Sequence, residues 1–522
     1  MFQEEKLNHH IMRKASYWLA AMVGLTLILS ACSSEEDINP DNRNLKHITF
    51  TAGQSQTRTI IDSQDATQIN WQAGETISIL DGTSTTRCFK LTSEAGKPEG
   101  VFDGMAQEQE KDIYTAVYPY QEKGLVLDGN SVKGAWLDSV QTATAGTFDP
   151  KANLMMARTK SGDKILQFHN MTAFVKVTPQ MDCEQITIVS ADSTVALAGT
   201  MTLTLDENGK PSAKVTDNAS HQVSLTGKIE AGKTYYIAIA PATLKEGIRM
   251  GITTADGKHY YKDASKLSAF KENKVLNLGS ISTSKMNWLP YVTFSAKEAQ
   301  EVTLKDAFGL QLPINMEYST DYGKHWNTFS VNKNYAFGNS SRLMLRGDNP
   351  QGTAISNSDD FSKIEFSTFS FVNNQKVACS GDIRTLVKKD DYENARTQNV
   401  RYIALFNGCK QLTSAPELPA TELEEKCYAW MFQNCTSLTQ APLLPAKTLT
   451  AHCYFSMFYG CASLTSVTML AESGFNATEC LHGWLAEAGT NGSILTVAAG
   501  KGSNETIKDE NNTPNYWKIV EQ

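Results

Sequence analysis

The sequence predicts a mainly β protein that ends in a short α/β solenoid. Short runs of alternating apolar residues follow one another from residue 46 onward, which is the pattern of half-buried strands. Asp-Gly and Asn-Gly pairs separate these runs, and such pairs favour hairpin turns because both central residues need positive φ. A 26-residue segment repeats near the C-terminus, and a period of this length is typical of stacked solenoid coils.

Residues 1–31 are predicted to be a leader and a secretory signal. Residues 12–14 begin a basic region, an apolar run follows to residue 29, and small residues precede Cys32. This order resembles a bacterial lipobox, which implies that the Cys32 thiol is acylated and opens the mature chain. A transmembrane anchor is one alternative, but the apolar run is shorter than the roughly 20 residues of a spanning helix. Ordinary signal cleavage, with Cys32 incidental, is the other.

Residues 32–45 are expected to be a polar tether. The sequence Ser-Ser-Glu-Glu-Asp after Cys32 resembles the signal that sends lipoproteins of Gram-negative anaerobes to the outer face of the outer membrane. This resemblance implies a surface-exposed outer-membrane lipoprotein whose lipid attaches it to the membrane; a merely soluble tether is the alternative. The net charge of −8, without a later basic block, argues against nucleic acid as a partner.

Residues 46–283 contain short motifs in the order found in the fimbrillin family of pilus subunits, which this stretch resembles. The motifs are residues 48–50 (Ile-Thr-Phe), 57–59 (Thr-Arg-Thr), 71–77 (Trp-Gln-Ala-Gly-Glu-Thr-Ile), 166–170 (Leu-Gln-Phe-His-Asn), 173–177 (Ala-Phe-Val-Lys-Val), 198–199 (Ala-Gly), 235–241 (Tyr-Tyr-Ile-Ala-Ile-Ala-Pro) and 277–279 (Asn-Leu-Gly). The resemblance implies two tandem transthyretin-like β-sandwiches, at residues 46–165 and 166–283.

The fimbrillin resemblance also bears on assembly. In polymerising members an Arg- or Lys-specific protease removes the first strand, which leaves a groove for the donor strand of a neighbour. Arg58 is therefore a candidate for proteolytic processing, with an ordinary surface arginine as the alternative. A shaft subunit also donates a C-terminal strand, but here residues 284–522 follow that position, which favours a tip, an accessory role or a stand-alone adhesin.

Two motifs that suggest enzymes are better explained as turns. Residues 227–234 satisfy the phosphate-loop pattern, but that loop needs a helix directly after it, and β-prone residues 235–239 follow instead. Residues 319–326 match an Asp-box, a structural hairpin that propellers carry in several copies, and this chain has one. The sequence also lacks a His-Glu-x-x-His pair, a nucleophile elbow and a ligand-spaced histidine cluster. We therefore expect no enzyme, cofactor or metal site.

Arg346, Gly347 and Asp348 form a candidate binding loop. An exposed loop of this sequence can dock to host integrins. The three residues follow an alternating apolar run and precede Asn-Pro, so a strand-terminating turn is the alternative.

Residues 284–400 are expected to form a β-rich connecting domain, residues 401–490 the repeats and residues 491–522 a C-terminal cap. The repeats resemble the BspA-type leucine-rich repeats of bacterial surface antigens. Within one repeat, Leu423, Cys427, Trp430 and Met431 have the spacing of one helical face, with Thr421 and Glu424 as a capping box. The repeat cysteines form two ladders, Cys409/Cys435/Cys461 and Cys427/Cys453/Cys480. We expect buried free thiols, with a disulfide or thiolate metal site as the alternative.

These features predict a cell-surface lipoprotein that acts as an adhesin or ligand-binding protein, with a fimbrillin-like base that displays the solenoid. The expected partners are the outer membrane, through the lipid, and a protein or glycan of a host or bacterial surface. The first alternative is a polymerising pilus tip or accessory subunit that assembles with other pilus subunits by donor-strand exchange. The second is a glycan-processing surface enzyme, which would need two carboxylates that converge in a cleft.

Overall fold

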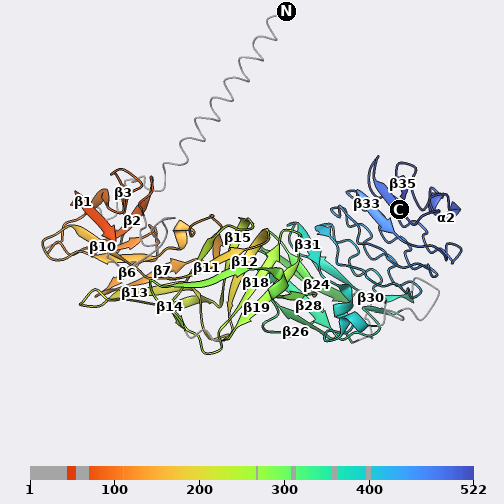
Figure 1. Ribbon diagram of the computed structural model, residues 1–522, viewed down its shortest axis with the longest axis horizontal. Helices are drawn as coiled ribbons and strands as arrows, with labels where there is room; N and C mark the ends of the chain where they lie inside the picture. The colour runs from red at the N-terminus through yellow and green to blue at the C-terminus, as the bar shows by residue number, and fades with distance from the viewer. Residues whose placement is uncertain are drawn as a thin grey trace, which may run out of the picture.

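The computed structural model describes residues 44–54, 70–109, 111–265, 269–306, 313–355, 363–395 and 401–522. The protein is mainly β, as predicted, and its parts follow one another along one long axis, from an N-terminal barrel to C-terminal coils (Figure 1). Within the described residues, no helix is long and apolar enough to cross a membrane.

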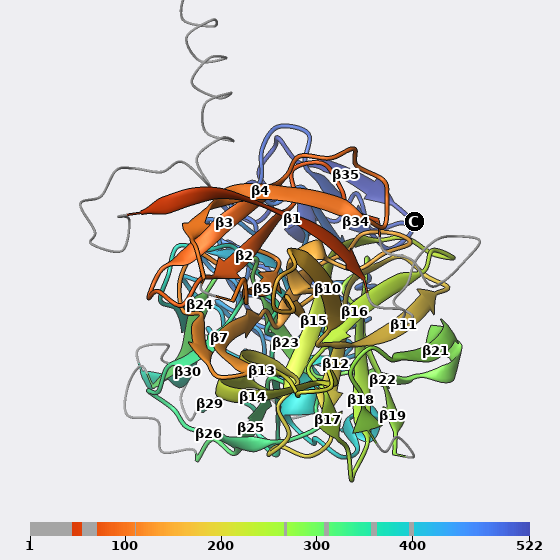
Figure 2. The ribbon, with the colours of Figure 1, turned by 90° about the vertical axis from the view of Figure 1, so that its left-hand side faces the viewer.

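The first module, expected to be a transthyretin-like β-sandwich, has its strands closed into a barrel. Its strands lie in the order β1-β10-β9-β5-β2-β3-β4, and β1 lies along β4 over the top of the barrel in Figure 2. The bounds are β1 Leu45–Gln54, β2 Thr76–Leu80, β3 Thr86–Leu91, β4 Gly100–Gln107, β5 Thr115–Tyr118, β9 Met155–Arg158 and β10 Ile165–Asn170. The barrel closes because β1 pairs with β4 on one side and with β10 on the other. Trp71 fills the interior, with its ring 5.0 Å from the ring of Phe102.

The second module packs several sheets around one core. Its main sheet has the order β22-β19-β18-β12-β15-β8, and smaller sheets have the orders β14-β13-β7-β6, β16-β11-β21 and β17-β20. The bounds are β6 Val126–Asp128, β7 Ser131–Leu137, β8 Val140–Thr142, β11 Ala173–Pro179, β12 Cys183–Ser190, β13 Ala198–Leu205, β14 Pro211–Ser220, β15 Gln222–Ile229, β16 Tyr235–Ile239, β17 Ala242–Thr243, β18 Ile248–Thr254, β19 His259–Ala264, β20 Ala269–Phe270, β21 Val275–Ile281 and β22 Asn287–Leu289, with short 3₁₀ turns η3 Pro150–Ala152 and η4 Thr283–Lys285.

The predicted boundary between residues 165 and 166 does not match the strand pairing. Strands β6, β7 and β8 precede that boundary, but they belong to the second module, where β7 pairs with β6 and β13 and β8 pairs with β15. Strand β10 contains the boundary and closes the barrel. The apolar side chains explain this exchange, because Val132 and Leu137 are buried in the second core while Leu166 and Phe168 are buried in the barrel. The chain therefore passes between the two modules more than once.

The third region consists of two facing sheets, with the orders β26-β25-β28-β23-β31-β32 and β27-β24-β30-β29. The bounds are β23 Val292–Ser295, β24 Gln300–Asp306, β25 Met316–Ser319, β26 Asn327–Phe329, β27 Tyr335–Phe337, β28 Leu343–Gly347, β29 Ala354–Ile355, β30 Glu365–Phe371, β31 Val377–Ser380 and β32 Leu412–Ser414, with 3₁₀ turns η6 Ile383–Leu386 and η7 Tyr392–Asn394. Strand β32 belongs to the first repeat, yet it pairs in parallel with β31. One apolar cluster extends from Val292 to Trp517, so the predicted boundary at residue 400 cuts through a single core.

The repeats stack as coils, but the arc predicted to be helical is a series of turns. Amide groups of alternate residues donate within the coil, as Met431 does to the Tyr428 carbonyl at 3.2 Å, and the intervening amides donate to the next coil, as Tyr428 does to the Cys453 carbonyl at 3.1 Å. Positive φ recurs every four residues, at Lys426, Trp430 and Asn434. This four-residue spacing resembles the spacing of a helical face, which is why the sequence pattern predicted the wrong backbone.

Two ladders of aromatic rings run through the coils. Phe406 and Phe432 stack at 5.3 Å, and Phe432 and Phe458 stack at 5.6 Å. The ladder begins in the third region, because Phe369 of β30 lies 5.4 Å from Phe406. Tyr402, Tyr428 and Tyr454 form the second ladder, at 6.1 and 6.2 Å.

The repeat cysteines are buried free thiols, as expected. The first ladder bridges neighbouring coils, because the Cys435 thiol donates to the Phe406 carbonyl at 3.1 Å and the Cys461 thiol to the Phe432 carbonyl at 3.0 Å. Burial raises the pKa of the Cys453 and Cys461 thiols to about 12. In the described residues no group of cysteine, histidine or carboxylate side chains could hold a metal ion.

The C-terminal residues close the stack. Strands β33 Ser466–Met469, β34 Ile494–Val497 and β35 Lys518–Glu521 form a parallel sheet. The short helix α2, Glu505–Lys508, begins at Asn504, whose side chain accepts the Ile507 amide. The Trp517 indole donates to the Ala488 carbonyl at 2.9 Å, which fixes the last segment to the final coil.

Candidate functional site

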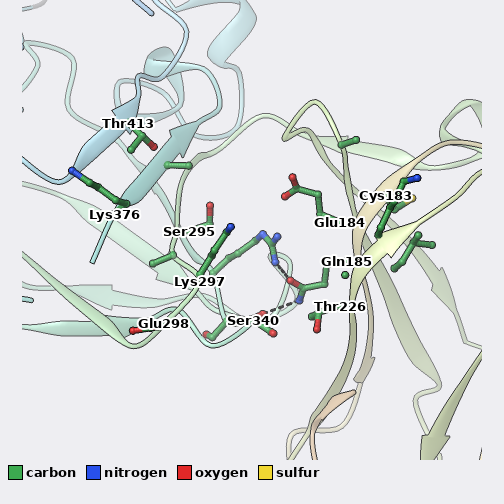
Figure 3. Close-up of a pocket in the computed structure, with 18 of the residues that line it drawn as sticks. Cys183, Glu184, Gln185, Thr226, Ser295, Lys297, Glu298, Ser340, Lys376 and Thr413 are labelled. Carbon is green, nitrogen blue, oxygen red and sulfur yellow. Dashed lines mark hydrogen bonds between the residues drawn. The ribbon is translucent and has the colours of Figure 1, made fainter. Parts of the chain in front are cut away.

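A groove of about 930 Å³ lies where the second module meets the third region and the first coil (Figure 3). The second module supplies the start of β12, the end of β15 and the turn after β18. The third region supplies the turns that precede β24 and β28, and Thr413 of the first coil lies at one end. Three parts of the chain that are far apart in sequence therefore build one site.

The wall of the groove depends on a glycine. At Gly338, where φ is +90°, an added Cβ would lie 1.9 Å from the Glu298 carbonyl oxygen, so the two turns touch backbone to backbone. Asn339 and Ser340 also have positive φ, and Gly338 and Ser341 exchange backbone hydrogen bonds of 2.9 Å. This tight turn places Arg342 at the start of β28, beside the groove.

Gln185 of β12 holds this turn from the opposite module. Its amide nitrogen donates to the Ser340 carbonyl at 2.7 Å and contacts the Ser224 hydroxyl at 3.0 Å, and its amide oxygen accepts from Nη1 of Arg342. Figure 3 shows Gln185 and Ser340 on facing sides of this contact. The buried amide therefore positions the arginine without neutralising its charge.

Arg342 is a buried cation without a carboxylate partner among the described residues. Its side chain belongs to a residue that is 9% exposed, and its Nε has no hydrogen-bond partner within the described part of the chain. The nearby His259 adds no second positive charge, because burial, aided by the Arg342 charge, lowers the pKa of His259 to about 3. His259 contacts the hydroxyls of Thr253 and Ser380, at 3.0 and 3.1 Å.

The other charges of the groove are spread along it. Lys297 is exposed and lies between Ser295 and Gln185 in Figure 3. The Lys376 ammonium donates to the Ser437 hydroxyl of the second coil, so it marks the end of the groove nearest the repeats. The acidic residues Glu184 and Glu298 come from opposite walls, and Figure 3 shows their carboxylates well apart, on different sides of Lys297.

The candidate binding loop at residues 346–348 is not an exposed loop, and this part of the prediction is wrong. Arg346 and Gly347 belong to strand β28, which pairs with β25. The Arg346 guanidinium lies 4.1 Å from the Trp326 ring and forms an ion pair with Glu317 at 2.7 Å. Asp348 lies at the exposed end, 3.4 Å from Lys389. The arginine is held by packing and by charge and does not extend into solvent.

The Asp-box and the phosphate-loop pattern are both turns. The Asp321 carboxylate accepts the amides of Lys324 and His325 at 3.0 Å, and Ser319 donates to it at 2.6 Å. Residues 227–229 end β15, residues 230–234 connect it to β16, and a strand rather than a helix follows. Cys32 and Arg58 lie outside the described residues, so lipid attachment and processing stay predictions.

Sequence reasoning missed the groove. Arg342 stands directly before an apolar strand, and Gln185, 157 residues earlier, is the third residue of β12. The sequence pattern that could have identified Arg342 is a charged residue directly before a run of apolar residues that forms a buried strand. Its pairing with Gln185 depends on how the two modules dock, which no local pattern encodes.

No protein-family model matches this sequence, and no curated protein matches it. Among solved structures, a candidate cell adhesion protein from Bacteroides uniformis is similar over 46% of this chain and 95% of its own, with 17% identity and a TM-score of 0.30. Another from Bacteroides ovatus matches 47% of this chain and 96% of its own, with 11% identity and a TM-score of 0.31. A fimbrial protein from Bacteroides ovatus matches 48% of this chain and 52% of its own, with 13% identity and a TM-score of 0.25. Each of these matches leaves about half of this chain uncovered, so function is inferred below from the chain's own residues.

Proposed function

We propose that this protein is a non-enzymatic adhesin of the outer cell surface, anchored by an acylated Cys32, that binds a ligand in the groove between its second module and third region. The observation that carries the proposal is Arg342, a buried guanidinium at the groove with no carboxylate partner in the described residues. Burying such a charge costs several kcal/mol unless it is compensated. A protein that keeps this arrangement gains most from it when a ligand supplies the missing charge.

A catalytic role finds less support in the same groove. Glu184 and Glu298 do not converge on one point, whereas glycoside hydrolysis requires two carboxylates about 5 to 10 Å apart on either side of the scissile bond. The third carboxylate of the lining, Asp182, accepts the Ala231 amide at 2.9 Å. The other polar side chains of the groove include hydroxyls, amides, lysines and Arg342, which suit binding. We therefore assign binding, and not turnover, to this site.

The modules are joined firmly, as display away from a membrane requires. At the junction of the second module and third region, Nη1 of Arg249 donates to the Tyr322 carbonyl at 3.0 Å, and the Tyr322 hydroxyl contacts the Thr253 hydroxyl at 3.0 Å. The third region and the coils share one apolar core. A lipid at the N-terminal end would thus hold the groove and the coils away from the bilayer.

Two experiments test the proposal. The mature chain, probed on an array of glycans and matrix proteins, should bind a defined ligand, and replacing Ser295, which lines the groove, with Trp should block that binding. In cells, the Cys32→Ala variant should lose labelling by a palmitate analogue and leave the membrane fraction. Unchanged labelling would overturn the anchor, and unchanged ligand binding by Ser295→Trp would overturn the groove as the binding site.

A polymerising pilus subunit is the second candidate, and strand β1 favours it. Leu45–Gln54 is the first strand of the barrel and pairs along both sides, with β4 and β10. Cleavage at Arg58, after this strand, would let β1 leave and would expose two strand edges to a neighbour's strand. Treatment with an Arg-specific protease, followed by a search for SDS-resistant ladders, tests this; an Arg58→Ala variant is the control and should form none.

A further inference from the structure

We infer that the groove binds an oligosaccharide with one carboxylate-bearing sugar, and that Arg342 and Lys297 bind its carboxylate. The inference rests on the proposed function, because it names the ligand class of the groove that was proposed as the binding site. It is carried by the placement of Arg342, by the distribution of charge along the groove and by the occupied strand edges around it.

Arg342 calls for an anion. Its Nη1 is occupied by the amide oxygen of Gln185, which is a neutral acceptor. Its Nε has no partner in the described residues, and no described carboxylate lies within ion-pair distance of the guanidinium. Arginine presents its N–H groups in a planar fork that matches a carboxylate, so a ligand carboxylate that reaches the guanidinium from the groove would compensate its charge.

Lys297 adds a second positive charge from the same wall. It precedes Glu298, whose carbonyl oxygen touches Gly338 in the turn before Arg342. Figure 3 shows its ammonium group on the side that faces Gln185. The exposed Lys297 has no ion-pair partner in the part of the chain that the structure describes, and it can therefore reorient toward a ligand at little cost in lost contacts.

The groove as a whole favours a ligand with one negative charge. Its lining contains three lysines and Arg342, but also Asp182, Glu184 and Glu298. Lys228 is already paired with Glu230 at 2.6 Å. A polyanion would meet the acidic residues on both walls and be repelled by them. A single acidic sugar among neutral sugars would place its charge near Arg342 and its hydroxyls elsewhere.

The surrounding strands favour a saccharide over a peptide. An extended peptide binds most readily to a free strand edge. Near the groove, β32 pairs with one edge of β31, and β8 pairs with one edge of β15, so neither edge is free for a peptide. What faces the groove are turns and strand ends that bear hydroxyl and amide groups, such as Ser295, Ser341 and Gln375. These groups both donate and accept hydrogen bonds, as sugar hydroxyls do.

The test is an array of oligosaccharides in matched pairs that differ only in a terminal sugar, which is either a uronic or sialic acid or its neutral counterpart. The full mature chain should bind at least one acidic member and not its neutral partner. A tetraglutamate peptide and trigalacturonate serve as the acidic peptide and the polyanion. Binding of the tetraglutamate as tight as that of the best acidic saccharide would overturn the saccharide, and preference for trigalacturonate would overturn the single charge.

Variants assign the contacts. Lys297→Glu should weaken binding of the acidic member at least about tenfold, and so should Arg342→Met. Lys262→Glu makes the same charge change at an exposed position of β19, outside the groove, and should alter affinity less than about twofold. Arg342 is buried, so the Arg342→Met result counts only if the thermal unfolding of this variant matches that of the parent chain. If it does not match, the exposed Lys297 still provides the test through Lys297→Glu.

The outcomes separate the two proposals. If the chain binds a ligand without a carboxylate and Ser295→Trp abolishes that binding, the inference fails and the proposed function stands. If Ser295→Trp changes no binding at all, or if no ligand on any array binds, both fail. If an acidic member binds but Lys297→Glu and Arg342→Met bind it as the parent does, the assignment of the carboxylate to these residues is overturned.

Discussion

The Tyr322 ring of the third region lies directly on Gly251 of the second module. A Cβ added to Gly251 would be 2.3 Å from Cγ of Tyr322, closer than any real contact. Tyr322 is itself in the left-handed region, with φ of 55°, within the Asp-box hairpin. The Asp-box hairpin therefore does more than turn the chain, because its tyrosine ring forms a close contact between the third region and the second module.

The Gly251→Ala variant should loosen this joint. The added methyl group must push the Tyr322 ring away, and overpacking of this kind costs about 1–3 kcal/mol. Urea denaturation should show a lower free energy of unfolding for the second module and third region. Gly53→Ala is the matched control, because its Cβ would lie 3.8 Å from Glu99 and make an ordinary contact. Equal stability of Gly251→Ala and the parent chain would show that the contact between Tyr322 and Gly251 does not hold the two modules together.

His259 should make the protein less stable in mild acid. Its pKa is lowered to about 3 in the folded chain, while an unfolded histidine titrates near pH 6.5. Between these values the unfolded chain binds a proton that the folded chain does not, so stability rises with pH and falls as pH drops from about 6.5 toward 3.

The measurement is the free energy of unfolding from pH 7 to pH 4, in the parent chain and in His259→Gln. The slope for the parent should exceed that of the variant by up to about 1.4 kcal/mol for each pH unit. Other titrating groups are shared by both chains and cancel in the difference. Parallel curves would show that His259 is not held in its neutral form.

The sequence predicted the mainly β architecture, because alternation of apolar residues and turn residues are local signals. It identified both cysteine ladders, since residues 26 or 27 positions apart occupy equivalent places in successive coils. It failed where two patterns coincide. The spacing of Cys427, Trp430 and Met431 fits a helix, yet Trp430 has φ of 56°. The backbone is not helical because alternate amides of one coil donate to carbonyl groups of the next coil.

The errors in boundaries and in the site have a different cause. Strands β6 to β8 leave the first module because their apolar faces fill the second core, and strand patterns do not say which core they fill. Arg346 resembles an exposed recognition residue in sequence, but the Trp326 ring and Glu317 hold it in place. Both depend on contacts between segments distant in sequence, which local patterns do not carry.

The repeat thiols should resist modification in the folded protein. Burial raises the pKa of Cys453 and Cys461 to about 12, so almost no thiolate, the reactive form, exists at neutral pH. Mass spectrometry after brief iodoacetamide treatment should find both cysteines unmodified in the native chain and alkylated in guanidinium chloride. Rapid alkylation of the native chain would contradict a buried ladder, and an intermolecular disulfide would contradict free thiols.

The third region should control the stability of the coils through Phe369. Its ring begins the aromatic ladder at Phe406, and its carbonyl accepts the Cys409 thiol at 3.1 Å. Phe369 therefore takes the place in the ladder that a preceding coil would supply, although it belongs to β30. Phe369→Ala should lower the free energy of unfolding by about 3–5 kcal/mol and should speed amide hydrogen exchange in residues 402–435.

Phe102→Ala is the control, because it removes an equally buried ring from the barrel and should leave amide exchange in the coils unchanged. If the coils exchange at the parent rate in Phe369→Ala, the repeats and the third region are separate folding units and the shared core is not what stabilises them.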